Sequence, residues 1–377
     1  MSESAVIEKS AQAAKDAHLR YVTEETPGIT RIRAGKSFNY FDEKGRKIRD
    51  ADTLARIKSL VIPPAWKDVW ICPTANGHVQ ATGRDARGRK QHRYHTKYRE
   101  VRDEAKYGRM IDFAKSLPKI DRATTRDLRK RGLAKERVLA AVIRVMQKTL
   151  IRVGNEEYAR QNHSYGLTTL EDKHARVRGR KVKFEFRGKS SKQHEIDLED
   201  PRLARIVKEC QDLPGEQLFQ YQDGDGNVVD VNSGDVNEYL RAIAGEEFTA
   251  KDFRTWAGTV LAARALSMLE EIDSDAARKK NLVRAVEAVA QRLGNTTAVC
   301  RKCYIHPEVI NAYMDGSLAA MLGKRAGKEL ARSMHSLSPE EAAVLALLQQ
   351  TLSRARPRAA KRASHRGTNG QNGRKAR

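Results

Sequence analysis

The chain has 377 residues, with 72 lysines and arginines against 48 aspartates and glutamates, so its formal net charge is +24. Such an excess repels itself in a compact state unless the natural partner is a polyanion. Its longest purely apolar run, residues 342–348, is far too short to cross a bilayer, and the first twenty residues lack the apolar stretch of a secretory signal. We therefore expect a cytoplasmic, nucleoid-associated protein that binds nucleic acid, with no membrane partner.

The first part of the chain has the pattern of a small β domain. Residues 1–21 are polar and alanine-rich, and we expect an N-terminal extension there. Short alternating segments predict strands at 29–33, 38–41, 69–71, 78–81 and 89–95. A short helix carrying Leu54, Ile57 and Leu60 is expected to start at Asp50 or Asp52 and to end before Pro63. Residues 22–103 are thus predicted to form a mainly antiparallel β domain that binds DNA.

Residues 104–350 are predicted to form a larger, mostly helical domain. A buried stripe at helical spacing consists of Leu139, Val142, Ile143, Met146, Leu150 and Ile151. Alternation over 182–186 and 193–198 predicts a β-hairpin with Lys189 at its tip. Further helices are expected at 236–246, 252–270, 276–293 and 307–314. A last helix begins at Ser338, which has the capping-box partner Glu341.

The end of the chain, residues 351–377, is predicted to be a disordered basic tail, since it is rich in arginine and its apolar content is almost limited to alanine. The expected fold class is therefore α+β, with a small β domain, a larger helical domain and the tail. Cys300 and Cys303 have the spacing of a zinc pair. No second pair completes four ligands, so neither a metal nor another cofactor is expected.

Chemistry-bearing residues are scattered along the chain, and no phosphate-binding glycine loop or hydrolase motif is present. Arginines in apolar settings, a lysine on a hairpin tip and several tyrosines remain. These are the parts that phosphoryl transfer without a metal requires: arginine forks neutralise the transition-state charge, a tyrosine is the nucleophile, and a lysine protonates the leaving oxygen.

Four segments carry a specific resemblance to type IB DNA topoisomerases, above all to the compact bacterial and poxvirus branch. They are Leu150-Ile151-Arg152-Val153-Gly154-Asn155, Phe186-Arg187-Gly188-Lys189, Lys251-Asp252-Phe253-Arg254-Thr255-Trp256 and Cys300-Arg301-Lys302-Cys303-Tyr304. Lys189 follows Arg152 by 37 residues, which is the family's spacing. The resemblance implies that Arg152, Lys189, Arg254 and Tyr304 are catalytic.

One position departs from the family's commoner pattern. The family often has a histidine nine residues before the tyrosine, where this chain has Asn295. An asparagine still donates an N–H to a phosphate oxygen, but it carries no proton in the reaction. The bacterial branch tolerates the replacement, so Asn295 is kept as a fifth candidate.

The resemblance also implies a mechanism. Tyr304 attacks a DNA phosphorus to give a 3′-phosphotyrosyl link and a free 5′ hydroxyl, and resealing reverses this step without ATP or metal. A phenol is protonated at neutral pH, so Arg152 and Arg254 are expected to favour its ionised form. Lys189 is expected to protonate the departing 5′ oxygen. The chain is then an isomerase that relaxes supercoiled DNA.

Each of these residues has an ordinary alternative. An arginine beside an apolar stripe, such as Arg152, often anchors a salt bridge, and Arg254 can pair along its own helix. Lys189 alone is a solvated turn residue, and Tyr304 alone is a packing residue. Asn295 follows a glycine at a helix end, where capping explains it. Only their order and spacing together favour catalysis.

The expected DNA contacts lie mainly on the cation-rich segment 83–94. A strand of this kind fits the major groove, where Gln91 can read adenine and Lys90 or Arg93 can read guanine. The resemblance assigns Gln91 and Tyr94 to base contacts and Tyr158 to a backbone contact. Two basic lobes joined near residues 103–110 are expected to close around double-stranded DNA as a clamp formed by a monomer.

Two other functions remain open at this point. A tyrosine recombinase uses similar chemistry, but it has His-x-x-Arg where this chain has Lys251-x-x-Arg254, and its N-terminal domain is helical. A non-enzymatic nucleoid protein would use only the charge, and its DNA binding would not depend on Tyr304.

Overall fold

The computed structural model describes residues 3–245, 248–269, 274–323 and 337–350. The basic tail expected at 351–377 lies outside these residues. The chain divides into two compact units, 1–108 and 109–377. The domain boundaries expected from the sequence stay a prediction, and the structural division falls inside helix α3 (Thr96–Asp127).

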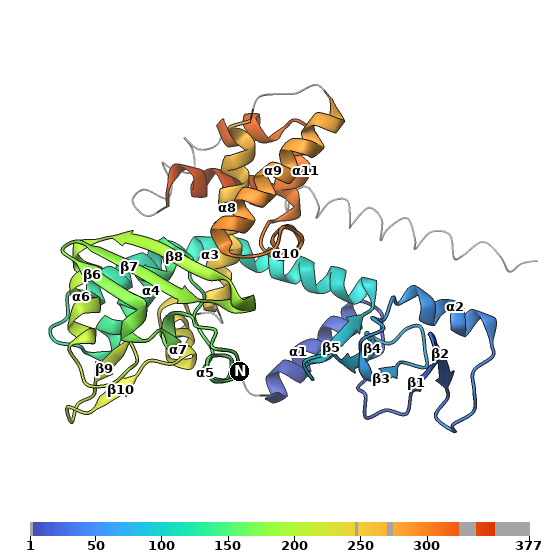
Figure 1. Cartoon of the computed structure of the whole chain (residues 1–377). Helices are drawn as coiled ribbons and strands as arrows, with labels where there is room; N and C mark the ends of the chain where they lie inside the picture. Colours follow the sequence, from blue (N-terminus) through green and yellow to red (C-terminus); the bar gives the residue numbers. More distant parts are fainter. Residues whose placement is uncertain (1–2, 246–247, 270–273, 324–336, 351–377) are drawn as a thin grey trace, which may run out of the picture. The chain divides into compact units, whose positions relative to one another are not determined.

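The first unit is built around an antiparallel sheet with the strand order β2-β1-β3-β4-β5 (Figure 1). Its strands are β1 (Ile29–Ala34), β2 (Ser37–Phe41), β3 (Lys67–Ile71), β4 (Val79–Arg84) and β5 (Lys90–Tyr94). Helix α2 (Ala51–Ser59) is N-capped by Asp50, whose side chain accepts the N–H of Thr53. Ile57 of this helix packs with Ile29 and Ile71 of the sheet in a buried core. The expected strands and the expected helix are thus confirmed.

The N-terminal segment is helical as far as Asp16, in α1 (Glu3–Asp16), and its end is joined to the sheet. The Arg20 N–H donates to the Asn76 carbonyl at 2.8 Å. Tyr21 stacks on the buried His78 with ring centroids 4.6 Å apart. Residues 20 and 21 are therefore part of the first unit's packing.

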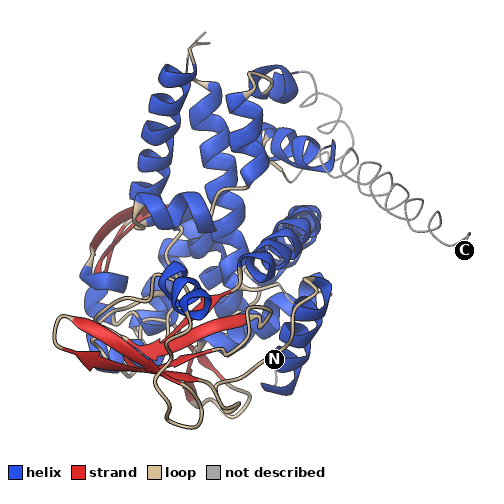
Figure 2. Cartoon of the chain, turned by 90° about the vertical axis from the view of Figure 1, so that its right-hand side faces the viewer, coloured by secondary structure: helices blue, strands red, loops and turns tan. Residues whose placement is uncertain are grey.

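The second unit is mostly helical (Figures 1 and 2). Its helices after α3 are α4 (Lys135–Thr149), α5 (Glu156–Asn162), α6 (Pro201–Gln211), α7 (Ser233–Ala244), α8 (Ala250–Ser267), α9 (Asp275–Leu293), α10 (Thr297–Cys303) and α11 (Pro307–Met314). The stripe expected on α4 is buried. The long helix α3 was not expected from the sequence, and it contains Pro118. A two-stranded sheet, β9 (Gln220–Gln222) and β10 (Val228–Asp230), was also missed.

The expected hairpin is confirmed as part of a three-stranded sheet of β6 (Ala175–Arg178), β7 (Lys181–Arg187) and β8 (Gln193–Glu199). Val182, Phe184 and Phe186 of β7 are buried, whereas Lys183 between them pairs with Glu195 on the open face. Helices α4 and α6 pack on the buried face. The tip, with Lys189, is the short turn η3 (Lys189–Ser191).

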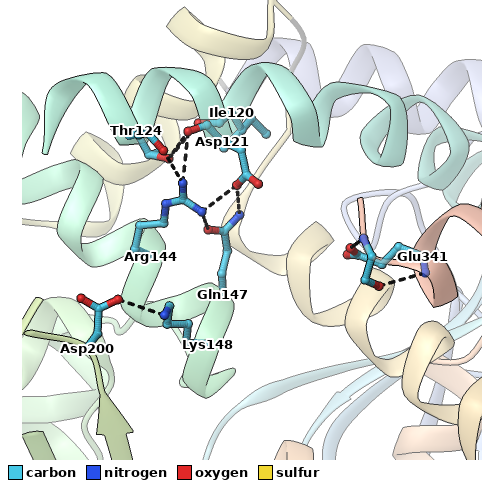
Figure 3. Close-up of polar contacts among 10 residues, drawn as sticks. Ile120, Asp121, Thr124, Arg144, Gln147, Lys148, Asp200 and Glu341 are labelled. Carbon is cyan, nitrogen blue, oxygen red and sulfur yellow. Dashed lines mark hydrogen bonds and ion pairs between the residues drawn. The ribbon is translucent and has the colours of Figure 1, made fainter. Parts of the chain in front are cut away.

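Polar contacts hold the C-terminal half of α4 in place (Figure 3). The Arg144 guanidinium donates to the Asp121 carboxylate of α3 at 2.9 Å, and Lys148 pairs with Asp200 at 2.9 Å. The end of α4 therefore has a fixed position, and the segment that follows it carries Arg152.

The last described helix has the capping box predicted from the sequence. The Glu341 N–H donates to Ser338 Oγ at 3.2 Å, and the Ser338 N–H donates to the Glu341 carboxylate at 2.9 Å. Glu341 also accepts the indole N–H of Trp256 on α8 at 2.9 Å. Across the described part of the chain, no helix combines the length and apolarity needed to span a membrane.

Candidate active site

Arg152 comes directly after the end of α4. Leu150 closes this helix in a left-handed conformation with φ 59°, which turns the chain sharply. The carbonyls of Arg152 and Val153 then accept the N–H groups of Leu167 and Thr168. A side chain on Gly166 would lie 2.6 Å from the Gly154 backbone nitrogen, so this close approach requires glycine. The local backbone therefore holds Arg152 rigidly.

Arg254 lies near the start of one helix and contacts the ends of two others. It lies on α8 and is only 4% exposed. Its guanidinium donates to the carbonyl of Leu150 at the end of α4 and, at 2.6 Å, to that of Leu293 at the end of α9. Burial, followed by the charge of Arg152, lowers the pKa of Arg254. Two like charges are thus held close together in a poorly solvated place.

Asn295 lies in the turn between α9 and α10. Gly294 ends α9 with φ 61°, and the side chain of Thr296 caps α10. Neither capping role belongs to Asn295, whose Oδ1 accepts a hydrogen bond from Arg152. Its Nδ2 is buried and has no hydrogen-bond partner among the residues that the structure describes. This amide thus keeps a donor free for a further acceptor.

Tyr304 terminates α10 and packs against α8. Its carbonyl accepts from the Thr259 hydroxyl at 3.3 Å, and a side chain on Gly258 would lie 2.6 Å from that carbonyl. The Arg254 guanidinium lies 5.3 Å from the centre of the Tyr304 ring. Burial lowers the pKa of Arg152, whereas the charge of Tyr304 and a hydrogen bond with it act in the opposite direction. Tyr304 thus interacts with both arginines.

Lys189 shares a pocket with the two arginines. The pocket lining includes Arg152, Lys189, His194 and Arg254, but Tyr304 is not part of it. Lys189 itself is exposed, and its Nζ lies 5.8 Å from the ring centre of Tyr158. Lys189 therefore lines the same pocket as the two arginines, and Tyr158 lies beside Lys189.

The ordinary explanations for the two arginines are wrong. Within the described residues, neither Arg152 nor Arg254 pairs with a carboxylate: they donate to backbone carbonyls and to Asn295, and both also interact with Tyr304. Cys300 is fully buried, and burial raises the pKa of its thiol to about 11. In the same part of the chain, no group of three or more His, Cys, Asp or Glu side chains could hold a metal.

The candidate DNA-reading residues of the first unit lie together on β5. The Lys90 ammonium pairs with Glu24 at 2.5 Å, and the Gln91 amide donates to Asp85 at 3.0 Å. Arg93 donates to the Val61 carbonyl at 2.7 Å. The last member, Tyr94, stacks on the buried Tyr98, and burial raises the pKa of its phenol. In this structure these side chains therefore make contacts within their own unit.

The sequence reasoning did not single out His194, although it lines the same pocket as Arg152 and Lys189. Its only sequence signal is its place opposite Phe186 in the hairpin, which a strand pattern alone does not mark as functional.

Two family models match the chain. One is described as "Eukaryotic DNA topoisomerase I, catalytic core" and matches residues 95–328. The other is described as "Bacterial DNA topoisomerase IB, N-terminal domain" and matches residues 37–85. The first match includes Arg152, Lys189, Arg254, Asn295 and Tyr304.

Two relatives of this chain are also named as DNA topoisomerases. The chain is 33% identical over 295 residues to a protein named DNA topoisomerase 1B of Acanthamoeba polyphaga mimivirus, and the alignment covers 76% of this chain and 88% of that protein. It is also 20% identical over 247 residues to the DNA topoisomerase 1B of vaccinia virus strain Copenhagen, covering 64% of this chain and 74% of the viral protein.

Proposed function

Because this chain belongs to the type IB DNA topoisomerases, we propose that it relaxes supercoiled DNA through a covalent 3′-phosphotyrosyl intermediate on Tyr304. The cleavage and the resealing need neither ATP nor metal. The observation that carries this proposal is the convergence of Arg152 and Arg254 on Tyr304, with no carboxylate paired to either guanidinium among the described residues.

In the proposed reaction each bond that breaks is matched by a bond that forms, and no cofactor takes part. The Tyr304 oxygen attacks phosphorus, the bond from phosphorus to the 5′ oxygen breaks, and the phenolic proton passes to solvent water as the new ester forms. Lys189 gives a proton to the departing 5′ oxygen, which leaves as a hydroxyl. Resealing runs the same steps backwards, and the tyrosyl ester conserves the bond energy that it needs.

The two arginines stabilise the negative charge that develops on the non-bridging phosphate oxygens. Arg152 and Arg254 are held in advance by carbonyls at helix ends, so they need little rearrangement when DNA binds. The unpartnered Nδ2 of Asn295 supports a further hydrogen bond to one of these oxygens. This is the place that the histidine takes in other members of the family.

For the grip on DNA we propose that β5 enters the major groove, where Lys90, Gln91, Arg93 and Tyr94 face bases or phosphates. Tyr158, beside Lys189, contacts the backbone near the cleavage site. One molecule closes on the duplex as a clamp, and the protein acts where the chromosome is, in the cytoplasmic nucleoid. Binding is then expected to weaken steeply as salt rises, since neutralised phosphates release counterions.

The deciding experiment is relaxation of supercoiled plasmid in EDTA without ATP, comparing the wild type with Tyr304→Phe. We expect relaxation by the wild type alone. Equal relaxation by both proteins would place the nucleophile elsewhere. Binding without relaxation by either protein would favour a recombinase or a passive nucleoid protein.

A further inference from the structure

The tip of the β7–β8 hairpin has a backbone conformation that its own residues do not favour. Ser190 and Ser191 both lie in the left-handed region, with φ 63° and 60°. A residue with a side chain adopts this region at a cost, and two in succession need support from their surroundings. The position of Lys189, which directly precedes them, therefore depends on what holds the tip.

The imidazole of His194 packs against this tip. Its imidazole stacks on Phe186, its cross-strand partner, with centroids 5.0 Å apart and an angle of 13° between the planes. A side chain built on Gly188 would lie 2.6 Å from the imidazole Cδ2 and Nε2. The ring therefore fills the space beside the Gly188 Cα, one residue before Lys189.

The same ring contacts the turn that carries Asn295. A side chain built on Gly294 would lie 2.6 Å from the imidazole Cε1. The imidazole is thus inserted between two glycines, one before Lys189 and the other before Asn295. A second link runs in parallel, because the Lys192 ammonium donates to the Asn295 carbonyl at 3.0 Å.

We propose that His194 is a positioning residue, whose flat ring sets the distance between the hairpin tip with Lys189 and the turn with Asn295. The inference rests on the proposed function, in which Lys189 is the proton donor for the 5′ oxygen. A ring of this size fits between the two glycine backbones, and a shorter side chain leaves the tip without support. Lys189 then reaches the leaving oxygen less often, since small displacements of a catalytic group slow a reaction strongly.

The first test compares three substitutions in single-turnover cleavage, measured as covalent adduct on a short duplex at saturating protein. His194→Ala is expected to slow cleavage by up to about 100-fold, with the Kd for DNA unchanged. His194→Gln is polar but lacks the ring, and it should be as slow. His194→Phe keeps the ring without its nitrogens and should restore the rate. Gln193→Ala, the exposed neighbour on the same strand, is the matched control and should cleave normally.

The second test asks whether the defect acts through Lys189. In a substrate with sulfur in place of the bridging 5′ oxygen, the leaving group is a thiolate, which needs no proton donor because a thiol has a pKa near ~8.5. We expect this substrate to restore cleavage by His194→Ala and by Lys189→Ala, but not by Asn295→Ala. Thermal melts of the variants without DNA serve to check that each is folded.

Several outcomes would overturn the inference. If His194→Phe melts at the wild-type temperature, so that the larger ring is accommodated, and is still as slow as His194→Ala, the nitrogens act and the ring is not a spacer. If the sulfur substrate restores Lys189→Ala but not His194→Ala, His194 does not act through Lys189, while the proposed function stands. If the sulfur substrate fails to restore Lys189→Ala, the proton-donor role in the proposed function is itself wrong.

Discussion

We predict that Asn295→Ala lowers the cleavage rate strongly but changes the free energy of unfolding only slightly. In the described part of the chain, the amide Nδ2 of Asn295 is buried without a partner, while its Oδ1 accepts from Arg152. A buried donor without a partner costs about 1–3 kcal/mol of desolvation. Removing the amide relieves this cost and at the same time loses the hydrogen bond to Arg152. The two changes have opposite signs, so the free energy of unfolding should change by no more than about 1 kcal/mol.

The cleavage rate of the same variant should fall much further. If Nδ2 donates to a charged phosphate oxygen in the transition state, the hydrogen bond contributes about 1.5–3 kcal/mol. Each 1.36 kcal/mol is a factor of ten in rate, so Asn295→Ala should cleave roughly 10- to 150-fold more slowly. Asn295→Asp should be slower still, because a carboxylate at this place repels the phosphate.

Single-turnover adduct formation at saturating protein gives the rate, and a thermal melt without DNA gives the stability. A second comparison with Asn295→His, whose imidazole also offers an N–H, should recover most of the activity. The reasoning would be refuted if Asn295→Ala cleaved at the wild-type rate, or if its loss of activity matched a loss of folded protein.

Three further predictions follow from individual contacts. Lys189→Ala should slow cleavage severely without weakening DNA binding, and a normal single-turnover rate would remove it as the proton donor. Glu24→Gln frees Lys90 and should tighten binding to non-specific duplex more than the equally charged Glu25→Gln does in a salt titration. Burial, followed by nearby cations, lowers the pKa of His194 below its ordinary value of about 6.5. The wild type should thus lose stability on acidification below that pH more steeply than His194→Phe, and parallel melting curves would contradict this.

The strands of the first unit's sheet and the β7–β8 hairpin were predictable from local patterns. Alternation marked β1, β2 and the β7–β8 hairpin, and Asp50 marked the start of α2. The long helix α3 was missed because Pro118 lies inside it and its charged first half lacks a clear apolar stripe. Its place in the fold is determined instead by buried residues such as Phe113 and by contacts such as Asp121 with Arg144.

The candidate site was predictable only as a set of residues. The motifs around Arg152, Lys189, Arg254 and Tyr304 identified the members through their resemblance to a family, but not their partners. The free donor of Asn295 and the imidazole of His194 between two glycines depend on segments about a hundred residues apart meeting in space. A local sequence pattern does not predict contacts between segments so far apart in the chain.

Among the described residues, backbone carbonyls, and not carboxylates, hold the two arginines, and this difference matters for the proposed function. A carboxylate beside Arg254 or Arg152 would hold it in place, but it would also neutralise its charge and repel a phosphate. The carbonyls of Leu150, Leu293 and Gly294 belong to the ends of α4 and α9, where acceptors lack a partner within the helix and carry partial negative charge. They orient both guanidiniums and, in the proposed mechanism, leave their positive charge for the DNA. In the same proposal, a bound phosphate relieves the repulsion between the two arginines, so that the site favours the charge that develops in the transition state.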